Sequence, residues 1–301
     1  MDDSQKFLDP QTLARVKDLE LTARRTVEGL VSGAHKSPLQ GVSVEFAEHR
    51  QYVPGDDTRH IDWKLFGKTD KFFLKRYEQE TNLVCNLLVD CSESMKYGSG
   101  GPTKLRRAAE LAAVLAYLVL SQQDSVGAAF FEDRVRYFVP PSGQASHLNQ
   151  ILHLLAVCQP ANAPSRIGEV LHELAGRMRK RSLVVLISDC FDDVEQILDG
   201  LRHLRYRRHE VVVLHVLDPA ELEFPFQDVV KFQGLESASE LLVDPKSLRK
   251  AYVREFDAYR RELQVGCRSR DVDYQLACTD EPIDRFLTRY LATRAGRRAS
   301  A

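Results

Sequence analysis

The sequence predicts a doubly wound α/β fold built on a mainly parallel sheet. From residue 83 onward, apolar runs of strand length alternate with amphipathic helix patterns. Three runs, over residues 83–89, 183–187 and 211–217, are almost entirely apolar, which is typical of strands buried on both faces of a parallel sheet. Two further runs, over residues 126–131 and 135–139, are separated by only three residues. A parallel crossover needs a much longer connection, so these two runs should form an antiparallel hairpin at the sheet edge.

The remaining elements follow in order along the chain. The helix pattern over residues 104–121 is apolar on nearly every side, so this helix should lie centrally in the fold. A small β-hairpin is expected as an insertion near residues 225–246, where the alternation of strands and helices is interrupted. The other expected elements are helices near 145–156 and 166–179, a helix marked by Val194 to Leu204, a helix marked by Leu248 to Leu263, a strand over 272–277 and a final helix marked by Ile283 to Tyr290.

The chain divides into an N-terminal accessory segment, residues 1–82, a main α/β domain, residues 83–295, and a disordered tail, residues 296–301. The segment begins with a helix pattern from about Pro10 to Leu30 and continues with a block dense in charged and aromatic residues, which holds the only tryptophan, Trp63. We expect this segment to form a small subdomain that packs on the sheet domain. Its candidates for a buried ion network are Arg50, Asp56, Asp57, Arg59, Asp62 and Arg76.

The composition is that of a soluble globular protein, with 44% hydrophobic and 28% charged residues in 301. A formal net charge of −1 argues against a general nucleic-acid binder. The six cysteines show no metal-binding spacing and mostly lie in apolar runs, which indicates a reducing compartment. The first ten residues are acidic and lack the apolar core expected of a signal peptide, and the longest apolar run, over residues 111–120, is shorter than a membrane span. We therefore expect a cytoplasmic protein without a membrane span.

Polar residues follow two of the predicted strands at the point where each strand ends. Asp90, Ser92 and Ser94 follow the first strand, Asp189 follows the run over 183–187, and Ser165 opens a helix between them. Ligands of doubly wound sheets bind where such loops meet, beyond the carboxyl ends of the strands. Carboxylate and hydroxyl oxygens suit a small hard cation such as Mg²⁺, or Mn²⁺ in its place. The five residues are therefore a candidate metal site.

Other interpretations of the same residues give different chemistry. A serine hydrolase would need G-x-S-x-G around Ser92 or Ser94, and an aspartate-nucleophile phosphatase would need a second aspartate where Ser92 stands. A phosphate-binding P-loop would need Ser or Thr at Leu105. The serines could instead cap turns and helices, and Asp192 and Asp193 are expected to cap the following helix. Neither a nucleophile–base pair nor a phosphate loop is complete.

Two motifs resemble known families. The residues "DCSES", from Asp90 to Ser94, match the D-x-S-x-S signature of von Willebrand factor A domains, and Asp189 falls where their second aspartate lies. The upstream residues "SVEFAEHRQYVPGDDTRHIDWK", followed by "FFLKRYEQE", resemble the signature of the bacterial domain-of-unknown-function 58 family. Members of that family join such a segment to a von Willebrand A-like domain. The resemblance covers roughly residues 25–295.

The resemblance implies a metal-ion-dependent adhesion site. Ser92 and Ser94 would be direct ligands of Mg²⁺, Asp90 and Asp189 would act largely through water, and Ser165 would stand in for the family's threonine. It implies a non-enzymatic, metal-dependent interaction module, an adaptor that works with a MoxR-type AAA ATPase on a client protein offering an acidic side chain. A metal-dependent hydrolase or phosphatase using the same residues, or a scaffold with a degenerate metal site, are the alternatives.

Overall fold

The computed structural model describes residues 18, 21, 45–51, 65–67, 72–78, 83–160, 165–226, 230–233, 240–243 and 245–299. The chain forms two compact units, one made of residues 39–83 and the other of the remaining residues. One boundary between the two units lies between residues 83 and 84. Asp18 forms an ion pair with Arg106, so this part of the N-terminal segment belongs to the larger unit.

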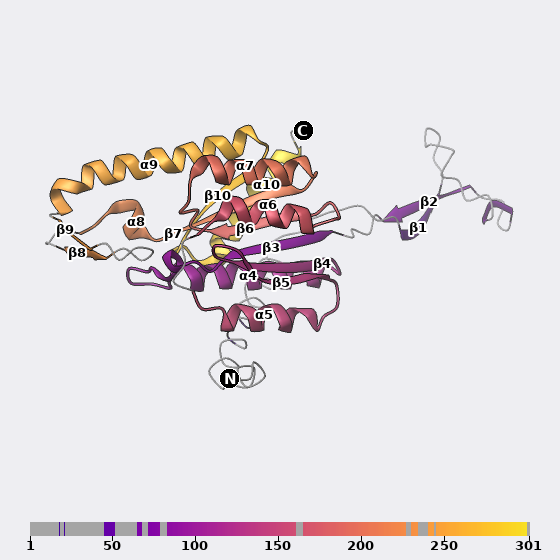
Figure 1. Ribbon diagram of the computed structural model, residues 1–301. Coiled ribbons are helices and arrows are strands. Elements are labelled where there is room, and N and C mark those ends of the chain that lie inside the picture. Colours follow the sequence, from indigo (N-terminus) through magenta and orange to yellow (C-terminus); the bar gives the residue numbers. More distant parts are fainter. Residues whose placement is uncertain are drawn as a thin grey trace, which may run out of the picture. The chain divides into compact units, whose positions relative to one another are not determined.

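A six-stranded sheet forms the centre of the larger unit, with strand order β10-β7-β6-β3-β4-β5 (Figure 1). All neighbouring pairs are parallel except β4 and β5, which are antiparallel at one edge, as predicted. The strands are β3 (Val84–Asp90), β4 (Ser125–Phe131), β5 (Val135–Ser142), β6 (Leu183–Ser188), β7 (Glu210–Leu217) and β10 (Asp273–Cys278). The chain builds outward from β3 through β4 to β5, then returns to the other side of β3 at β6. The order therefore reverses between β3 and β6, where doubly wound folds bind their ligands.

Helices cover both faces of the sheet (Figure 1). On one face lie α6 (Ile167–Arg177), α7 (Val194–Tyr206) and α9 (Pro245–Ser269), and on the other lie α4 (Lys104–Ser121) and α5 (His147–Val157). The helix α4 coincides with its predicted range and is buried along most of its length. Smaller elements are η2 (Glu93–Lys96) and α8 (Pro219–Glu223), and the last helix is α10 (Ile283–Ala299).

Alternate residues of the central strands form the core with the helices above them. Leu88, Leu186 and Val213 belong to one buried cluster with Leu171 of α6 and Leu201 of α7. Burial of a side chain of this size contributes about 1.5–3 kcal/mol. Because both faces are covered, the strands are apolar at successive positions, which explains why the sequence pattern identifies them.

The ends of several elements differ from the prediction. The helix α9 (Pro245–Ser269) is longer than the predicted residues 248–263. The prediction missed its first and last turns because they lack the apolar spacing of its middle. The helix α10 continues to Ala299, so residues 296–299 are helical where a disordered tail was expected. Alanine and arginine, which dominate this stretch, are strong helix formers. The predicted insertion is confirmed: β8 (Val230–Gln233) pairs antiparallel with β9 (Glu240–Val243).

The smaller unit contains an antiparallel pair of strands, β1 (Glu45–Gln51) and β2 (Phe73–Glu78), with an irregular register between Phe46 and Glu48.

Asp18 and Leu21 are helical, in agreement with the predicted N-terminal helix, whose other residues lie outside the described part of the chain. Trp63 and the side chains of the predicted ion network also lie outside it. Among the described residues, none of the helices is both long and apolar enough to cross a membrane.

Helices α6 and α7 approach closely at two glycines. A Cβ added to Gly168 would lie 2.8 Å from the carbonyl oxygen of Gln196, and one added to Gly200 would lie 2.7 Å from Cβ of Leu171. At Gly176, near the other end of α6, a Cβ would meet nothing within 4 Å. The backbones of the two helices therefore approach closely near the start of α6, whereas Gly176 faces solvent.

We predict that Gly168→Ala lowers the free energy of unfolding by about 1–3 kcal/mol, because the added methyl group forces the two helices apart. Gly176→Ala is the matched control on the same helix and should leave stability unchanged or raise it by up to about 1 kcal/mol. Urea unfolding followed by circular dichroism measures both. Equal stability of Gly168→Ala and wild type would contradict the close approach of α6 and α7.

Candidate metal centre

Asp90 ends the central strand β3 and is fully buried, with 0% of its surface exposed. Its Oδ1 accepts a hydrogen bond from the backbone N–H of Ser92 at 2.9 Å. Its Oδ2 accepts from the hydroxyls of Ser188 at 2.6 Å and Ser165 at 3.4 Å. Residues from three separate loops therefore meet at one carboxylate, at the point where the strand order reverses.

Ser92 and Ser94 lie directly beyond Asp90, and their Oγ atoms are 3.1 Å apart. Ser92 precedes the 3₁₀ turn η2, but its side chain forms no capping hydrogen bond with that turn. The turn is held in place by Met95, which is fully buried. The alternative in which Ser92 serves as a helix cap is therefore not what the structure shows, and both hydroxyls are directed to one another.

Ser165 is likewise not a helix cap. The first N–H of α6, on Ile167, donates to Oδ2 of Asp192 at 2.7 Å, so an aspartate from another loop caps this helix. Asp193 caps α7 as predicted, because its Oδ1 accepts from the N–H of Gln196 at 2.9 Å. Asp192 therefore caps α6 and not the helix that follows it. This division leaves the Ser165 hydroxyl to point at Asp90.

Asp189 is the one predicted site residue that makes no hydrogen bond to the other four in the structure. Its Oδ2 accepts from Nζ of Lys104 at 2.7 Å, and its Oδ1 accepts from the N–H of Phe191 at 3.2 Å. Lys104 is only 2% exposed and also donates to Oε1 of Glu221 at 2.6 Å. Burial lowers the pKa of the Lys104 ammonium, but the two carboxylates together raise it above its usual value. Asp189 thus belongs to a second, adjacent ion cluster.

The second ion cluster is tied to the end of β7. Asp218 and Glu221 form a capping box at the start of α8, in which the N–H of Asp218 donates to Oε2 of Glu221 at 2.8 Å. The other carboxylate oxygen of Glu221 holds Lys104. Asp218 also accepts from the N–H of Ser99 at 3.0 Å, which fixes the glycine-containing loop before α4. The loops after β3, β6 and β7 are therefore joined through charged groups.

The loop after β6 adopts a conformation that is rare outside glycine. Cys190 has a φ of 53°, in the left-handed region, and its N–H donates to Oγ of Ser188 at 2.8 Å. Nε2 of the buried His215 donates to the carbonyl of Asp189 at 2.8 Å, and the Tyr259 hydroxyl donates to the carbonyl of Asp192 at 3.1 Å. Burial lowers the pKa of His215 to about 4, so it is neutral at physiological pH. These bonds hold the loop in its strained conformation.

The electrostatics of Asp90 suit a bound cation. Burial, together with the charge of Asp189, raises the pKa of Asp90 to about 7, although hydrogen bonds from Ser188 and Ser92 lower it. The three donors to its oxygens are all neutral, whereas Asp189 has Lys104. Asp90 is therefore the one predicted site residue whose carboxylate has no cationic partner among the contacts described above. A divalent cation beside it would compensate that charge.

The donor types also suit such a cation. Within the described residues, no three His, Cys, Asp or Glu side chains gather closely enough to hold a metal ion. A site here therefore depends on the hydroxyls of Ser92, Ser94 and Ser165 beside the Asp90 carboxylate. Mg²⁺ accepts such a set, because it binds few protein carboxylates and keeps several water ligands. The residues present fit a magnesium or manganese ion.

Four residues of this centre are absent from the predicted site: Lys104, Ser188, His215 and Glu221. Ser188 is adjacent to Asp189 at the end of β6, so its position at the strand end was a usable signal. Lys104 begins a helix after a glycine-rich loop, and a lysine there is usually exposed. Its burial follows from contacts to residues 85 and 117 positions away, which no local pattern records.

The chain matches one protein family and is similar to uncharacterized mycobacterial proteins. The family model described as "Protein of unknown function DUF58" matches residues 48–262, well over half of the chain. Uncharacterized protein Rv1480 of Mycobacterium tuberculosis (strain H37Rv) and uncharacterized protein Mb1516 of Mycobacterium bovis are each 28% identical over 292 residues. The matches cover 95% of this chain and 90% of theirs.

Solved structures show weaker likeness. The conserved hypothetical protein BatB from Bacteroides thetaiotaomicron is 14% identical, with a TM-score of 0.48, over 71% of this chain and 99% of its own. An aerotolerance-related membrane protein from Bacteroides fragilis is 15% identical, with a TM-score of 0.46, over the same shares.

We predict that Lys104→Met lowers the free energy of unfolding by about 3–5 kcal/mol, because it leaves the buried Asp189 carboxylate without its partner. The control is Arg254→Met, which removes one member of an exposed pair whose side chains are 77% and 71% exposed. Its effect should stay within about 0.5 kcal/mol. Urea unfolding in the presence of chelator measures both. Similar stabilities of the two variants would contradict the structural role of the buried cluster.

Proposed function

The chain belongs to the DUF58 family, and because its residues 90–94 also resemble the von Willebrand A signature, we propose that it is a non-enzymatic, metal-dependent protein–protein interaction module. The observation that carries this proposal is the convergence of Asp90 with the hydroxyls of Ser92, Ser94 and Ser165 at the switch point of the sheet. In the proposed site the three hydroxyls are ligands of Mg²⁺ or Mn²⁺. Asp90 compensates part of the charge of the ion, and Asp189, which is paired with Lys104, would act through water.

The shortage of negative ligands explains why such a site would bind another protein. Neutral hydroxyls leave most of the positive charge of a dication uncompensated, and Asp189 is already paired with Lys104. When bound, the ion supplies a positive centre that attracts a carboxylate from a partner. This is the chemistry of an adhesion site, in which the last ligand comes from a different protein.

The surroundings of the serines support a binding role over a catalytic one. Activation of a serine nucleophile needs a base within hydrogen-bonding distance, but the Ser92 hydroxyl is directed at Ser94. His215 lies nearby, yet one ring nitrogen contacts the Asp189 carbonyl and the other lies 2.6 Å from the Tyr274 hydroxyl. Both of its nitrogens are therefore engaged.

An exposed aromatic residue stands beside the proposed site. Phe191 follows Asp189 and Cys190 in the loop after β6, and 61% of its surface is exposed. Aromatic residues, phenylalanine among them, are enriched in the cores of protein–protein interfaces. The proposed partner therefore offers an acidic side chain to the metal and an apolar group to Phe191. By family resemblance, we assign it to a client protein or to a MoxR-type AAA ATPase, in the cytoplasm.

We predict that the full chain binds a purified MoxR-type AAA ATPase, or its client, in Mg²⁺ and releases it in chelator. Phe191→Ala should weaken binding at least tenfold, equivalent to about 1.4 kcal/mol, without changing Mg²⁺ affinity. Tyr206→Ala is the matched control. Tyr206 is 85% exposed, but it lies at the end of α7, near the amino ends of the strands and away from the proposed site. Surface plasmon resonance measures the affinities. Equal binding in Mg²⁺ and in chelator would contradict the proposed function.

A further inference from the structure

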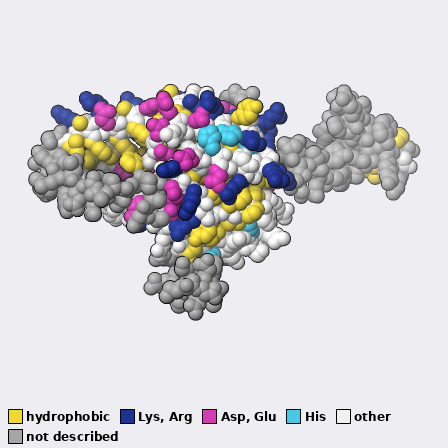
Figure 2. Space-filling view, in the orientation of Figure 1, with side chains coloured by type: hydrophobic (Ala, Val, Ile, Leu, Met, Phe, Trp, Pro, Cys, Tyr) yellow, Lys and Arg dark blue, Asp and Glu magenta, His cyan; other side chains and the backbone are white. Residues whose placement is uncertain are grey.

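A second cluster of side chains that can bind metals lies between α6 and α7, away from the Asp90 centre. His172 of α6 and His203 of α7 face each other with their Nδ1 atoms 2.8 Å apart. Their ring centroids are 5.0 Å apart and the ring planes are tilted by 44°. Histidine side chains gather at the molecular surface over these helices, among acidic and basic ones (Figure 2).

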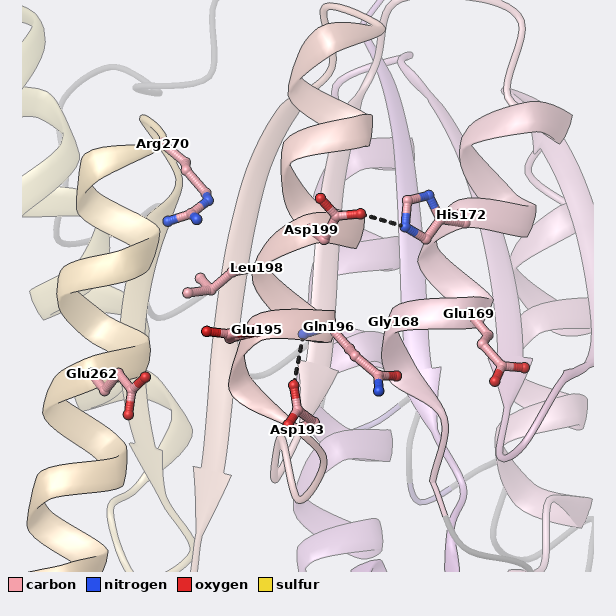
Figure 3. A pocket seen from close by; sticks show the side chains of 10 residues that line it. All are labelled: Gly168, Glu169, His172, Asp193, Glu195, Gln196, Leu198, Asp199, Glu262 and Arg270. Carbon is pink, nitrogen blue, oxygen red and sulfur yellow. Dashed lines mark hydrogen bonds and ion pairs between the residues drawn. The ribbon is translucent and has the colours of Figure 1, made fainter.

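Asp199 fixes the protonation of this pair. Its Oδ2 lies 3.1 Å from Nε2 of His172 (Figure 3). Its other oxygen accepts a hydrogen bond from Arg202. A carboxylate only accepts, so Nε2 of His172 carries the proton and Nδ1 carries a lone pair. That lone pair points at His203, whose Nδ1–H donates to it. The geometry presents one imidazole nitrogen ready to coordinate and a second one beside it.

We propose that His172 and His203 form a binding site for a divalent transition metal of the Zn²⁺, Ni²⁺ or Cu²⁺ class. Metal–imidazole bonds are about 2.0–2.1 Å long, so two nitrogens stand about 2.9 Å apart at the right angle preferred by Cu²⁺ and Ni²⁺, and about 3.3 Å apart on tetrahedral Zn²⁺. The observed separation of 2.8 Å is close to the Cu²⁺ and Ni²⁺ spacing. On binding, the His203 proton moves from Nδ1 to Nε2 and both rings turn, so that the two Nδ1 lone pairs meet at the ion and both imidazoles stay neutral.

The surroundings of the pair support a cation site. Asp199 on the far nitrogen of His172 completes the carboxylate–histidine–metal arrangement that orients ligands in known metal proteins. The side chain of His172 is 43% exposed, so an ion reaches it from solvent.

The adjacent groove between α6, α7 and α9 adds negative charge (Figure 3). Arg270 is the cation that lines it, and its acidic lining residues are Glu169, Asp193, Glu195, Asp199 and Glu262. Its negative field attracts cations to the His172 side chain.

This site differs in chemistry from the one at Asp90. Imidazole binds Zn²⁺, Ni²⁺ and Cu²⁺ well, whereas Mg²⁺ prefers oxygen ligands and should not compete. With two protein ligands, the remaining coordination positions are filled by water and stay open. Because the ligands come from different helices, a bound ion would also clamp α6 to α7 at the surface.

The test is to titrate the full chain separately with Cu²⁺, Ni²⁺ and Zn²⁺. Excess Mg²⁺ is present in each titration, so that it occupies any site that prefers oxygen ligands. Wild type should bind one ion that His172→Asn and His203→Asn each lose, and the Cu²⁺ form should show nitrogen hyperfine coupling by electron paramagnetic resonance. Asp199→Asn keeps both ligands but should weaken binding 10- to 100-fold. His147→Asn, on α5, is the control and should bind as wild type does.

Each outcome decides the proposal. Binding that survives in both His172→Asn and His203→Asn would assign the metal to other residues and overturn it, as would absence of binding to wild type. The pair would then be a hydrogen bond between helices and nothing more. Circular dichroism and thermal unfolding in chelator check that each variant is folded, and the exposure of His172 favours that result.

Discussion

Asp90 is a carboxylate buried at the end of the central strand, and much of the surrounding structure accommodates its charge. Removing a carboxylate from water is costly unless hydrogen bonds or an opposite charge replace the lost solvation. Here the N–H of Ser92 and the hydroxyls of Ser165 and Ser188 provide the hydrogen bonds. Since these groups come from three loops, the same requirement fixes the end of β3, the end of β6 and the approach to α6.

Asp189, the second carboxylate at the carboxyl ends of the strands, has a cationic partner. Asp189 is paired with the buried ammonium of Lys104, which Glu221 shares, so its charge is balanced inside the protein. Asp90 has neutral donors only, and its pKa is raised by burial and by Asp189. The excess of negative charge is therefore concentrated at Asp90, next to the hydroxyls of Ser92 and Ser94. This separation of roles is what makes the position suitable for a metal ion that a partner completes.

The sequence carries enough information for the sheet and for most of the centre. Buried parallel strands are apolar at successive positions, so β3, β6 and β7 are recognisable, and the residues just after them are Asp90 and Asp189. Lys104 is different, because its burial depends on Asp189 and Glu221, far away in sequence.

Other features also depend on tertiary contacts. His172 and His203 are 31 positions apart and meet only because glycines let α6 and α7 approach closely. The role of Asp192 as a cap for α6, instead of α7, likewise depends on where the two helices begin in space. Periodicity describes a single element, so it cannot reveal pairs of this kind.

The most direct test of the account is isothermal titration calorimetry of the full chain with Mg²⁺ and Mn²⁺. Wild type should bind one ion, and Asp90→Asn, which keeps the shape of the side chain but not its charge, should lose the binding heat. Asp193→Asn is the matched control, since Asp193 is an exposed helix cap that asparagine can replace. Equal heats for wild type and Asp90→Asn, or no binding by either, would contradict a metal centre at Asp90.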